Sequence, residues 1–288
     1  MSGGGPAAIG QAFRRAREAG RVALIPYVVA GYPDARGSVE AALTAIDAGA
    51  DLLEIGLPYS DPLADGATLQ RASTRALAAG ATLERSIAQV GEVHLTRPEV
   101  PIVAMGYVNQ MVGEGPRADA IRRLADAGAS GLILADLTPD EGEAVEGAAA
   151  AAGLALIYLV TPTTPPDRCA DVARRTTGFL YAVSLVGVTG ARRSLPASVG
   201  RFLRAVRAAS PVPVAVGFGV SRPEHVRRLA ADVDGVIVAS ALVDSLGPEG
   251  RDTAALGRLV RSLTKATRLE TRLVAARTVR PRAREAVA

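Results

Sequence analysis

The chain has 288 residues and a formal net charge of +4, and 49% of its residues are hydrophobic, which suits one large globular domain and excludes a disordered chain. Its apolar runs are far shorter than the ~20 residues that a membrane-spanning helix needs, and its N-terminus lacks the charged and apolar segments of a signal peptide. Cys169 is the only cysteine, so an intrachain disulfide and a cysteine-based metal cluster are excluded. We therefore expect a cytoplasmic protein that does not enter a membrane.

Short apolar runs recur along the chain, and each is followed by a stretch with helical periodicity. The runs cover residues 23–31, 51–58, 101–109, 131–136, 154–162, 179–184, 213–219 and 235–243. Strands that alternate with helices predict a parallel sheet covered on both faces. Because the early strands lack the G-x-G-x-x-G turn of open dinucleotide-binding sheets, we predict a closed α/β sheet, a (β/α)₈ barrel of the TIM-barrel type.

Three segments lie outside this repeating unit. Residues 7–20 are amphipathic and precede the first strand, where an extra N-terminal helix would cap the bottom of the barrel. Residues 59–99 exceed the length of one loop and one helix, so we predict a functional loop followed by two helices. Residues 271–288 are rich in arginine but carry no interleaved aromatic residues, which favours a flexible, solvated tail over a nucleic-acid-binding one. No linker divides residues 1–288, so we predict a single domain whose barrel core and helices span about 7–265.

Glu54 is the residue that the strand pattern singles out most clearly. Alternation along DLLEIGLP (51–58) places Leu52, Glu54 and Gly56 on one face of the strand, and this face would point into the barrel. An ionised carboxylate there is costly unless it is paired or solvated, so its pKa rises and it can act as a general acid or base near neutral pH. The alternative is a structural carboxylate that internal hydrogen bonds satisfy.

Two further carboxylates, Asp61 and Asp65, lie in the loop that directly follows this strand. Aspartate is common in turns, where it caps backbone groups, but two of them after a strand-end glutamate favour a functional site. We predict no metal, because neither His94 nor His225 falls at a strand end. Binding of Mg²⁺ by oxygen ligands alone is the alternative.

Glycine- and serine-containing turns follow the late strands of the predicted barrel. They are GVTG (187–190), GFG (217–219) and ASA (239–241), in which Ser240 would cap a short helix. Barrels often bind phosphate with their late loops and the N-terminus of an extra helix, because glycines let backbone N–H groups approach the anion. The alternative is that the glycines only make turns, but their recurrence favours a phosphorylated substrate.

Several residues at strand ends are further candidates for substrate contacts. Tyr181 is expected to face the interior, where it either bonds to Glu54 or to the substrate, or merely fills space. Candidates of second rank at the ends of the third and fourth strands are Tyr107, Asn109 and Asp136.

Four stretches of the chain resemble the family of tryptophan synthase alpha chains. They are IPYVVAGYP (25–33), LLEIGLPYSDPLADGATLQ (52–70), YAVSLVGVTG (181–190) and VGFGVSRPEHV (216–226). The resemblance runs in order from about residue 7 to residue 265, and the second stretch is highly specific.

The resemblance implies a retro-aldol cleavage of indole-3-glycerol phosphate to indole and glyceraldehyde 3-phosphate, in tryptophan biosynthesis. It assigns Glu54 as the general acid and base, Asp65 as the partner of the indole N–H, and Tyr181 as the tyrosine beside the catalytic glutamate. The implied substrate-pocket residues are Tyr27, Ile133 and Phe218, and Thr189 lies in the family's mobile loop, which closes over the site. Tyr107 is added as a substrate contact from its place at a strand end. The implied phosphate-binding residues are Gly190, Gly219, Ala239 and Ser240. The alpha chain itself would need no cofactor and would work with a beta chain that holds pyridoxal phosphate, in an alpha2-beta2 heterotetramer.

Two positions depart from the family pattern. Ala239 stands where the family usually has glycine, and a Cβ there is costly if the backbone needs a positive φ. Thr138 replaces a more usual proline in a region that in the family meets the beta chain.

Three other functions remain open at the level of sequence. They are a stand-alone indole-3-glycerol-phosphate lyase that releases free indole, a non-catalytic activating partner of a beta chain, and another phosphate-handling barrel such as a sugar-phosphate isomerase. The presence of both Glu54 and Asp65 argues against the non-catalytic partner, because a scaffold has no need of an inward-facing glutamate.

Overall fold

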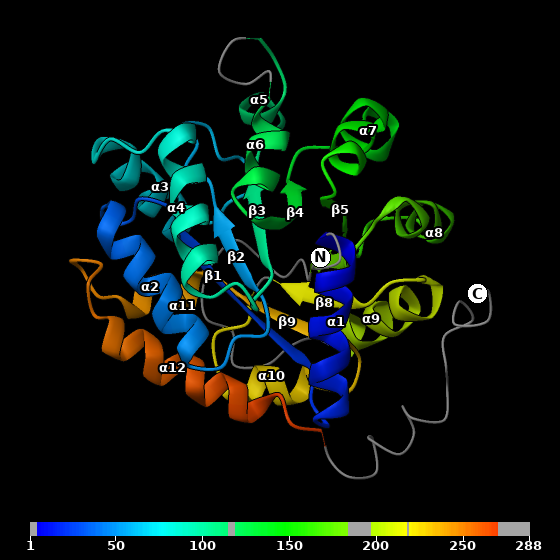
Figure 1. Cartoon of the computed structure of the whole chain (residues 1–288). Coiled ribbons are helices and arrows are strands. Elements are labelled where there is room, and N and C mark those ends of the chain that lie inside the picture. The colour runs from blue at the N-terminus through cyan, green and yellow to red at the C-terminus, as the bar shows by residue number, and fades with distance from the viewer. Residues whose placement is uncertain (1–4, 115–118, 184–196, 218, 270–288) are drawn as a thin grey trace.

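The computed structural model describes residues 5–114, 119–183, 197–217 and 219–269, in which strands alternate with helices (Figure 1). The strands are β1 (Ala23–Val29), β2 (Leu53–Gly56), β3 (Ile102–Gly106), β4 (Ala129–Leu134), β5 (Ala155–Ile157), β6 (Leu159–Val160), β7 (Leu180–Val183), β8 (Val214–Gly217) and β9 (Gly235–Val238). The helices are α1 (Gly5–Glu18), α2 (Ala35–Asp47), α3 (Ala67–Ala78), α4 (Leu83–Thr96), α5 (Val108–Met111), α6 (Ala120–Asp126), α7 (Glu143–Ala151), α8 (Pro166–Arg175), α9 (Ala197–Ala209), α10 (Pro223–Ala230), α11 (Ser240–Ser245) and α12 (Thr253–Ala266). A short 3₁₀ helix, η2, covers Pro139–Glu141. No helix in the described part of the chain is long and apolar enough to cross a membrane.

The strands form one parallel sheet whose two edges come from the same stretch of chain. Among the described residues the strand order is β5-β4-β3-β2-β1-β9-β8-β7-β6. Only Tyr158 separates β5 from β6, and its carbonyl accepts a hydrogen bond from the Tyr181 amide at 3.1 Å. The run that we predicted as the fifth strand is therefore two short strands, each paired with a different neighbour. The sheet closes at this point, which confirms the predicted barrel.

Side chains on each strand alternate between the barrel interior and the layer of helices. Around β2, Leu52 packs in the interior cluster, whereas Leu53 and Ile55 pack in the cluster that faces the helices. This is the alternation expected from the sequence, and it places Glu54 inside the barrel.

Helix α1 closes the end of the barrel where the strands begin. Its Ile9 and Phe13 belong to the interior cluster, and the Phe13 ring lies 5.7 Å from that of Phe179, just before β7. The fit is close, because a Cβ on Gly235 at the start of β9 would lie 2.8 Å from the Phe13 ring. The predicted N-terminal cap is confirmed, and the open mouth is left at the carboxyl ends of the strands.

The long connection after β2 has the predicted form of a loop followed by two helices. The loop runs from Leu57 to Gly66, and helices α3 and α4 follow it. It brings Asp65 back over the mouth of the barrel, where the end of β2 also delivers Glu54.

Candidate active site

Glu54 lies inside the barrel near the carboxyl end of β2. It pairs in register with Tyr27 of β1 and Val103 of β3, and only 1% of its surface is exposed. Its Oε2 atom has no hydrogen-bond partner among the described residues. Because leaving a buried polar atom unpaired costs free energy, such an atom in a folded protein calls for a functional explanation.

The two carboxyl groups at the mouth differ in their pKa values. Burial, and then the charge of Asp65, raise the pKa of Glu54 to about 8. Burial raises the pKa of Asp65 to about 6. At pH 7 Glu54 is therefore mainly protonated while Asp65 is mainly ionised. Carboxyl groups separated in this way are suited to different roles, one as a proton donor and the other as a fixed anion.

Two tyrosines lie over glycines of neighbouring strands in the same region. The Tyr27 hydroxyl is 1.8 Å from the place that a Cβ on Gly56 would take, and the Tyr181 hydroxyl is 2.1 Å from that of Gly217. A side chain at either glycine would displace a tyrosine. Burial, followed by the charges of Glu54 and Asp65, raises the pKa of both tyrosines, so their hydroxyls stay protonated.

Two side chains form hydrogen bonds with the backbone of the loop that carries Asp65. The Tyr107 hydroxyl accepts a hydrogen bond from the Ala64 amide at 3.1 Å, and Gln70 Nε2 donates to the Asp65 carbonyl at 3.0 Å. The Tyr107 ring also stacks on Tyr59, with ring centroids 5.1 Å apart. Tyr107, which we predicted as a substrate contact, thus holds the Asp65 loop in place.

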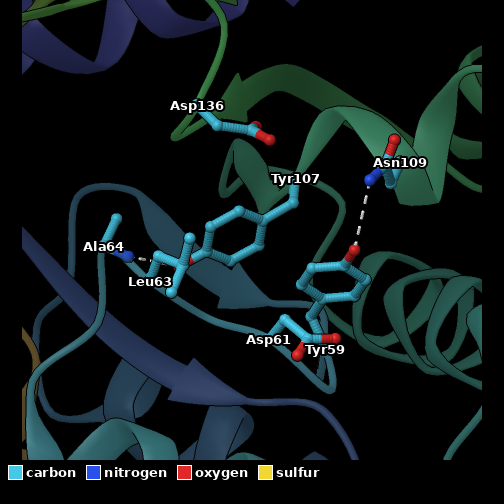
Figure 2. Close-up of a pocket in the computed structure, with 7 residues that line it drawn as sticks. All are labelled: Tyr59, Asp61, Leu63, Ala64, Tyr107, Asn109 and Asp136. Atoms are coloured by element: carbon cyan, nitrogen blue, oxygen red, sulfur yellow. Dashed lines mark hydrogen bonds between the residues drawn. The ribbon is translucent and has the colours of Figure 1, made fainter.

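A hollow of about 610 Å³ opens beside this loop (Figure 2). Its lining consists of Tyr59, Asp61, Leu63, Ala64, Tyr107, Asn109 and Asp136. Leu63 is 92% exposed at its rim, whereas Tyr107 is buried beneath it. Tyr59 and Leu63 were not predicted from the sequence, although two large apolar side chains in a turn-rich loop were a signal.

The ends of β8 and β9 form another part of the mouth. Gly219 has a φ of +76°, a conformation that glycine adopts without steric cost. Ala239 has a φ of −118°, so the strain expected at this alanine does not arise. The prediction that Ser240 caps α11 is wrong, because Ala239 occupies the cap position and the helix starts at Ser240 itself. The Ser240 side chain is exposed at this helix start.

Comparison with known proteins identifies the barrel. The family model of the tryptophan synthase alpha chain matches residues 13–271. The chain belongs to this family. An alpha chain of Roseiflexus castenholzii is 48% identical over 236 residues, which is 82% of this chain and 90% of that relative. One from Roseiflexus sp. (strain RS-1) is 47% identical over 257 residues, which is 88% of this chain and 98% of the relative.

Solved structures of the family share the fold. A structure of Mycobacterium tuberculosis tryptophan synthase has a TM-score of 0.83 at 38% identity, covering 91% of this chain and 98% of that chain. An alpha chain of Legionella pneumophila has a TM-score of 0.81 at 30% identity, covering 90% of this chain and 97% of that chain.

Tryptophan synthase alpha chains catalyse the cleavage of indole-3-glycerol phosphate, a lyase reaction of tryptophan biosynthesis, and have a beta chain as their partner. This activity matches the prediction made from the resemblance. The geometry of the mouth, with a protonated carboxyl group beside an ionised one, suits a reaction that moves protons on and off its substrate.

The remaining predicted residues of this alpha chain fall into two groups. Thr189, Gly190 and Phe218 lie outside the described residues. Ile133 lies on β4, fully buried in the interior cluster, and Thr138 is exposed just before η2. No cluster of three or more metal-ligating side chains occurs among the residues that the structure describes.

Proposed function

We propose that Glu54 moves the protons in the cleavage of indole-3-glycerol phosphate by this chain. In its protonated form it donates to the indole carbon that bears the glycerol chain, and the ring becomes an indolenine cation. The Glu54 carboxylate then takes the proton of the hydroxyl on the adjacent chain carbon. The carbon–carbon bond breaks, its electron pair returns to the ring, and indole and glyceraldehyde 3-phosphate leave. Glu54 ends protonated as it began, so the alpha chain uses no cofactor.

Asp65 holds the indole ring during this sequence. Its carboxylate accepts a hydrogen bond from the indole N–H and stabilises the positive charge that appears on the ring when the carbon is protonated. The single observation that carries the assignment is the buried Glu54, whose pKa is about 8 and whose Oε2 has no partner within the described part of the chain, next to the more acidic Asp65. Tyr181 lies beside Glu54 and keeps a protonated hydroxyl available to it or to the substrate.

With Glu54 and Asp65 at the reacting end of the indole ring, the remaining predicted residues are assigned to the ring pocket and to the phosphate group. The pocket for the indole ring is formed by Tyr27, Tyr107, Ile133, Thr189 and Phe218. The phosphate group is held by Gly190, Gly219, Ala239 and Ser240. The exposed Ser240 hydroxyl at the start of α11 and the backbone of Gly219 support this placement, because both suit an anion.

We place the beta chain over the hollow beside Tyr59 and Leu63. An exposed leucine and a stacked tyrosine pair at the rim of the active site favour a partner that both covers the mouth and receives the indole. The complex would be an alpha2-beta2 heterotetramer, with pyridoxal phosphate held by the beta chain.

The first test is the variant Glu54→Gln, assayed for indole release from indole-3-glycerol phosphate. Removing the general acid and base should lower kcat by roughly 10²–10⁴-fold, the usual contribution of such a group. The exposed Glu143→Gln on α7 is the matched control and should retain full activity. Turnover of Glu54→Gln near that of the wild type would refute the role of Glu54. A sugar phosphate that is converted while indole-3-glycerol phosphate is not would instead support an isomerase.

The pH dependence of kcat/KM tests the division of roles. The rate requires ionised Asp65 and protonated Glu54, so kcat/KM should rise through pH 6 and fall through pH 8, following the two pKa values. Asp65→Asn should remove the acid limb and move the alkaline limb to lower pH, because the charge of Asp65 helps to raise the pKa of Glu54. A profile in which this variant keeps the acid limb would contradict the assignment of Asp65.

The partnership is tested by adding the beta chain encoded by the same organism. Co-purification and a large increase in indole turnover are expected, and Leu63→Ser should weaken the association. The absence of both effects in the wild type would leave a stand-alone lyase that releases free indole.

A further inference from the structure

One face of helix α3 is bonded along its length to the segment that begins with α11. The helix starts two residues after Asp65, and its polar stripe consists of Thr68, Arg71 and Arg75. These positions are spaced by three and four residues, so they lie on one side of the helix. The other side, with Leu69 and Ala76, is buried against the barrel. This polar stripe joins α3, which follows Asp65 in the chain, to α11, which begins at Ser240, and to the turn after α11.

Arg75 makes the strongest of these contacts. Its Nη1 donates to the Pro248 carbonyl at 2.8 Å and its Nη2 donates to the Glu249 carbonyl at 3.1 Å. Its guanidinium carbon also lies 5.7 Å from the centroid of the Tyr32 ring, in the loop after β1. Two N–H donors bound to neighbouring carbonyls, with the Tyr32 ring below the guanidinium, fix the direction of the side chain as well as its position.

The turn that receives Arg75 is itself tightly placed. Gly250 has a φ of +70°, and a Cβ on it would lie 2.9 Å from the Tyr32 ring. Next to it, Arg251 forms an ion pair with Asp34. Because the turn packs against the β1 loop in this way, a bond from Arg75 to its carbonyls connects α3 to a fixed part of the barrel.

Nearer to the site, Asp244 of α11 bonds to the first turn of α3. The Thr68 hydroxyl donates to its Oδ1 at 3.2 Å, and Arg71 Nη2 lies 3.7 Å from the same atom. Arg71 also donates to the Thr68 hydroxyl at 3.1 Å. Thr68 is three residues from Asp65, and Asp244 is four residues from Ser240, so this contact lies between the two ends of the proposed site.

We propose that Arg75, assisted by the Thr68–Asp244 contact, is a positioning residue that sets the separation between Asp65 and the phosphate-binding start of α11. The inference rests on the proposed function, in which the indole end of the substrate meets Asp65 and the phosphate end meets Ser240. A ligand that spans both ends depends on their separation, whereas a ligand that occupies one end does not.

This role differs from a contribution to stability. The Arg71 and Asp244 side chains are 68% and 59% exposed, and that of Arg75 is 40% exposed. Contacts between groups as exposed as these add little to the free energy of unfolding. Their effect should therefore appear in the binding of two-ended ligands more than in thermal stability.

The experiment compares ligands of two kinds in Arg75→Met. The two-ended ligands are indole-3-glycerol phosphate and a non-cleavable indole that carries a phosphate on a three-carbon chain. The one-ended ligands are indole and glycerol 3-phosphate. We expect the KM of the substrate and the Kd of its analogue to rise about tenfold, and the Kd of each one-ended ligand to change by less than about twofold. Arg75→Lys, which keeps the charge but loses the paired donors, should give an intermediate increase.

Three variants at the Thr68–Asp244 contact and one control variant complete the test. Asp244→Ala and Thr68→Val should each raise the Kd of the two-ended analogue by about threefold. The double variant should raise it by less than the product of the two single effects, because both variants remove the bond between Thr68 and Asp244. The control is Arg122→Met on α6, a 60% exposed arginine paired with Asp119 and Asp126, which should leave every ligand unchanged.

The outcomes separate this inference from the proposed function. Equal weakening of one-ended and two-ended ligands, a loss of thermal stability that accounts for the whole effect, or no change in Arg75→Met would overturn the positioning role. If Arg75→Met does not fold, the same comparison in Thr68→Val decides. A wild-type chain that releases no indole would overturn the proposed function, and the positioning role with it.

Discussion

At the amino-terminal end of the barrel the interior is filled by Ile9 and Phe13 of α1, whereas at the carboxyl end it holds Glu54 beside Tyr27 and Tyr181. The same strands supply both ends. The lower end is apolar and closely packed, and a side chain on Gly235 would meet Phe13 at once. The upper end leaves a buried oxygen of the Glu54 carboxyl group without a partner among the residues that the structure describes.

The difference shows that one end of the sheet contributes mainly to stability and the other end holds the reactive groups. Apolar contacts at the lower end contribute to the free energy of unfolding. At the upper end, holding the buried Glu54 carboxyl group near the half-buried Asp65 costs part of that free energy. Barrel enzymes generally place catalysis at the carboxyl ends of their strands, and here the extra helix α1 reinforces the opposite end.

The largest effect on stability is expected at the lower end, in Phe13→Ala. Removing a buried aromatic ring leaves a cavity and should lower the free energy of unfolding by about 3–5 kcal/mol. Indole release per folded molecule should stay within about twofold of wild type, because Phe13 packs against the start of β9, at the end of the barrel opposite to Glu54. Urea unfolding and a kinetic assay on the same sample measure both. Leu95→Ala on α4, where the side chain is 83% exposed, is the control and should change stability by less than about 0.5 kcal/mol. A large fall in kcat for Phe13→Ala would show that the two ends are coupled.

At the upper end, Glu54→Gln should raise the free energy of unfolding, and the size of this increase should depend on pH. The pKa of Glu54 is raised from 4.5 to about 8, so the unfolded chain releases this proton at a lower pH than the folded chain does. Below pH 4.5 Glu54 is protonated in both states and does not reduce the free energy of unfolding of the wild type. As the pH rises from 4.5 to about 8, that free energy falls, because only the unfolded chain ionises this group. Relative to wild type, Glu54→Gln should gain roughly 2–5 kcal/mol between pH 5 and pH 8.5.

Urea unfolding at the two pH values measures this gain. The exposed Glu143→Gln serves as the reference and should show no such change. A Glu54→Gln variant whose relative stability is flat, or falls with rising pH, would contradict a strained carboxyl group at the upper end.

The smallest effect is expected at Ala239, beside the proposed phosphate site. Because its φ is −118°, glycine offers no relief of backbone strain, and Ala239→Gly should lower KM by about twofold at most or leave it unchanged. Steady-state kinetics with indole-3-glycerol phosphate decide the matter. A clear rise in KM would mean that the alanine is adapted to this site.

Much of the fold was predictable because its signals are local. Alternation within 51–58 was sufficient to place Glu54 inside and Ile55 outside, since successive residues of a strand point to opposite faces. The helical periodicity of 7–20 predicted α1. The division of the fifth strand at Tyr158 was not predictable, because the apolar run 154–162 is continuous and the break arises from pairing with two different neighbours.

The site was predictable in part. A glutamate at a strand end and an aspartate in the next loop suggested a pair, but the separation of their pKa values to about 8 and about 6 depends on burial by residues from several strands. The prediction that Ser240 caps α11 failed because helix limits vary by a residue or two, and sequence alone does not fix them.

The sequence by itself determined which residues face inward and where helices replace strands. It also determined that Glu54 ends a strand and that Asp65 lies in the loop after it. These properties depend on neighbours along the chain. Only the tertiary structure decided that Tyr27 and Tyr181 lie over Gly56 and Gly217, and that α3 is bonded to the segment after α11. Such contacts join residues far apart in the chain, and closing the barrel is what brings them together.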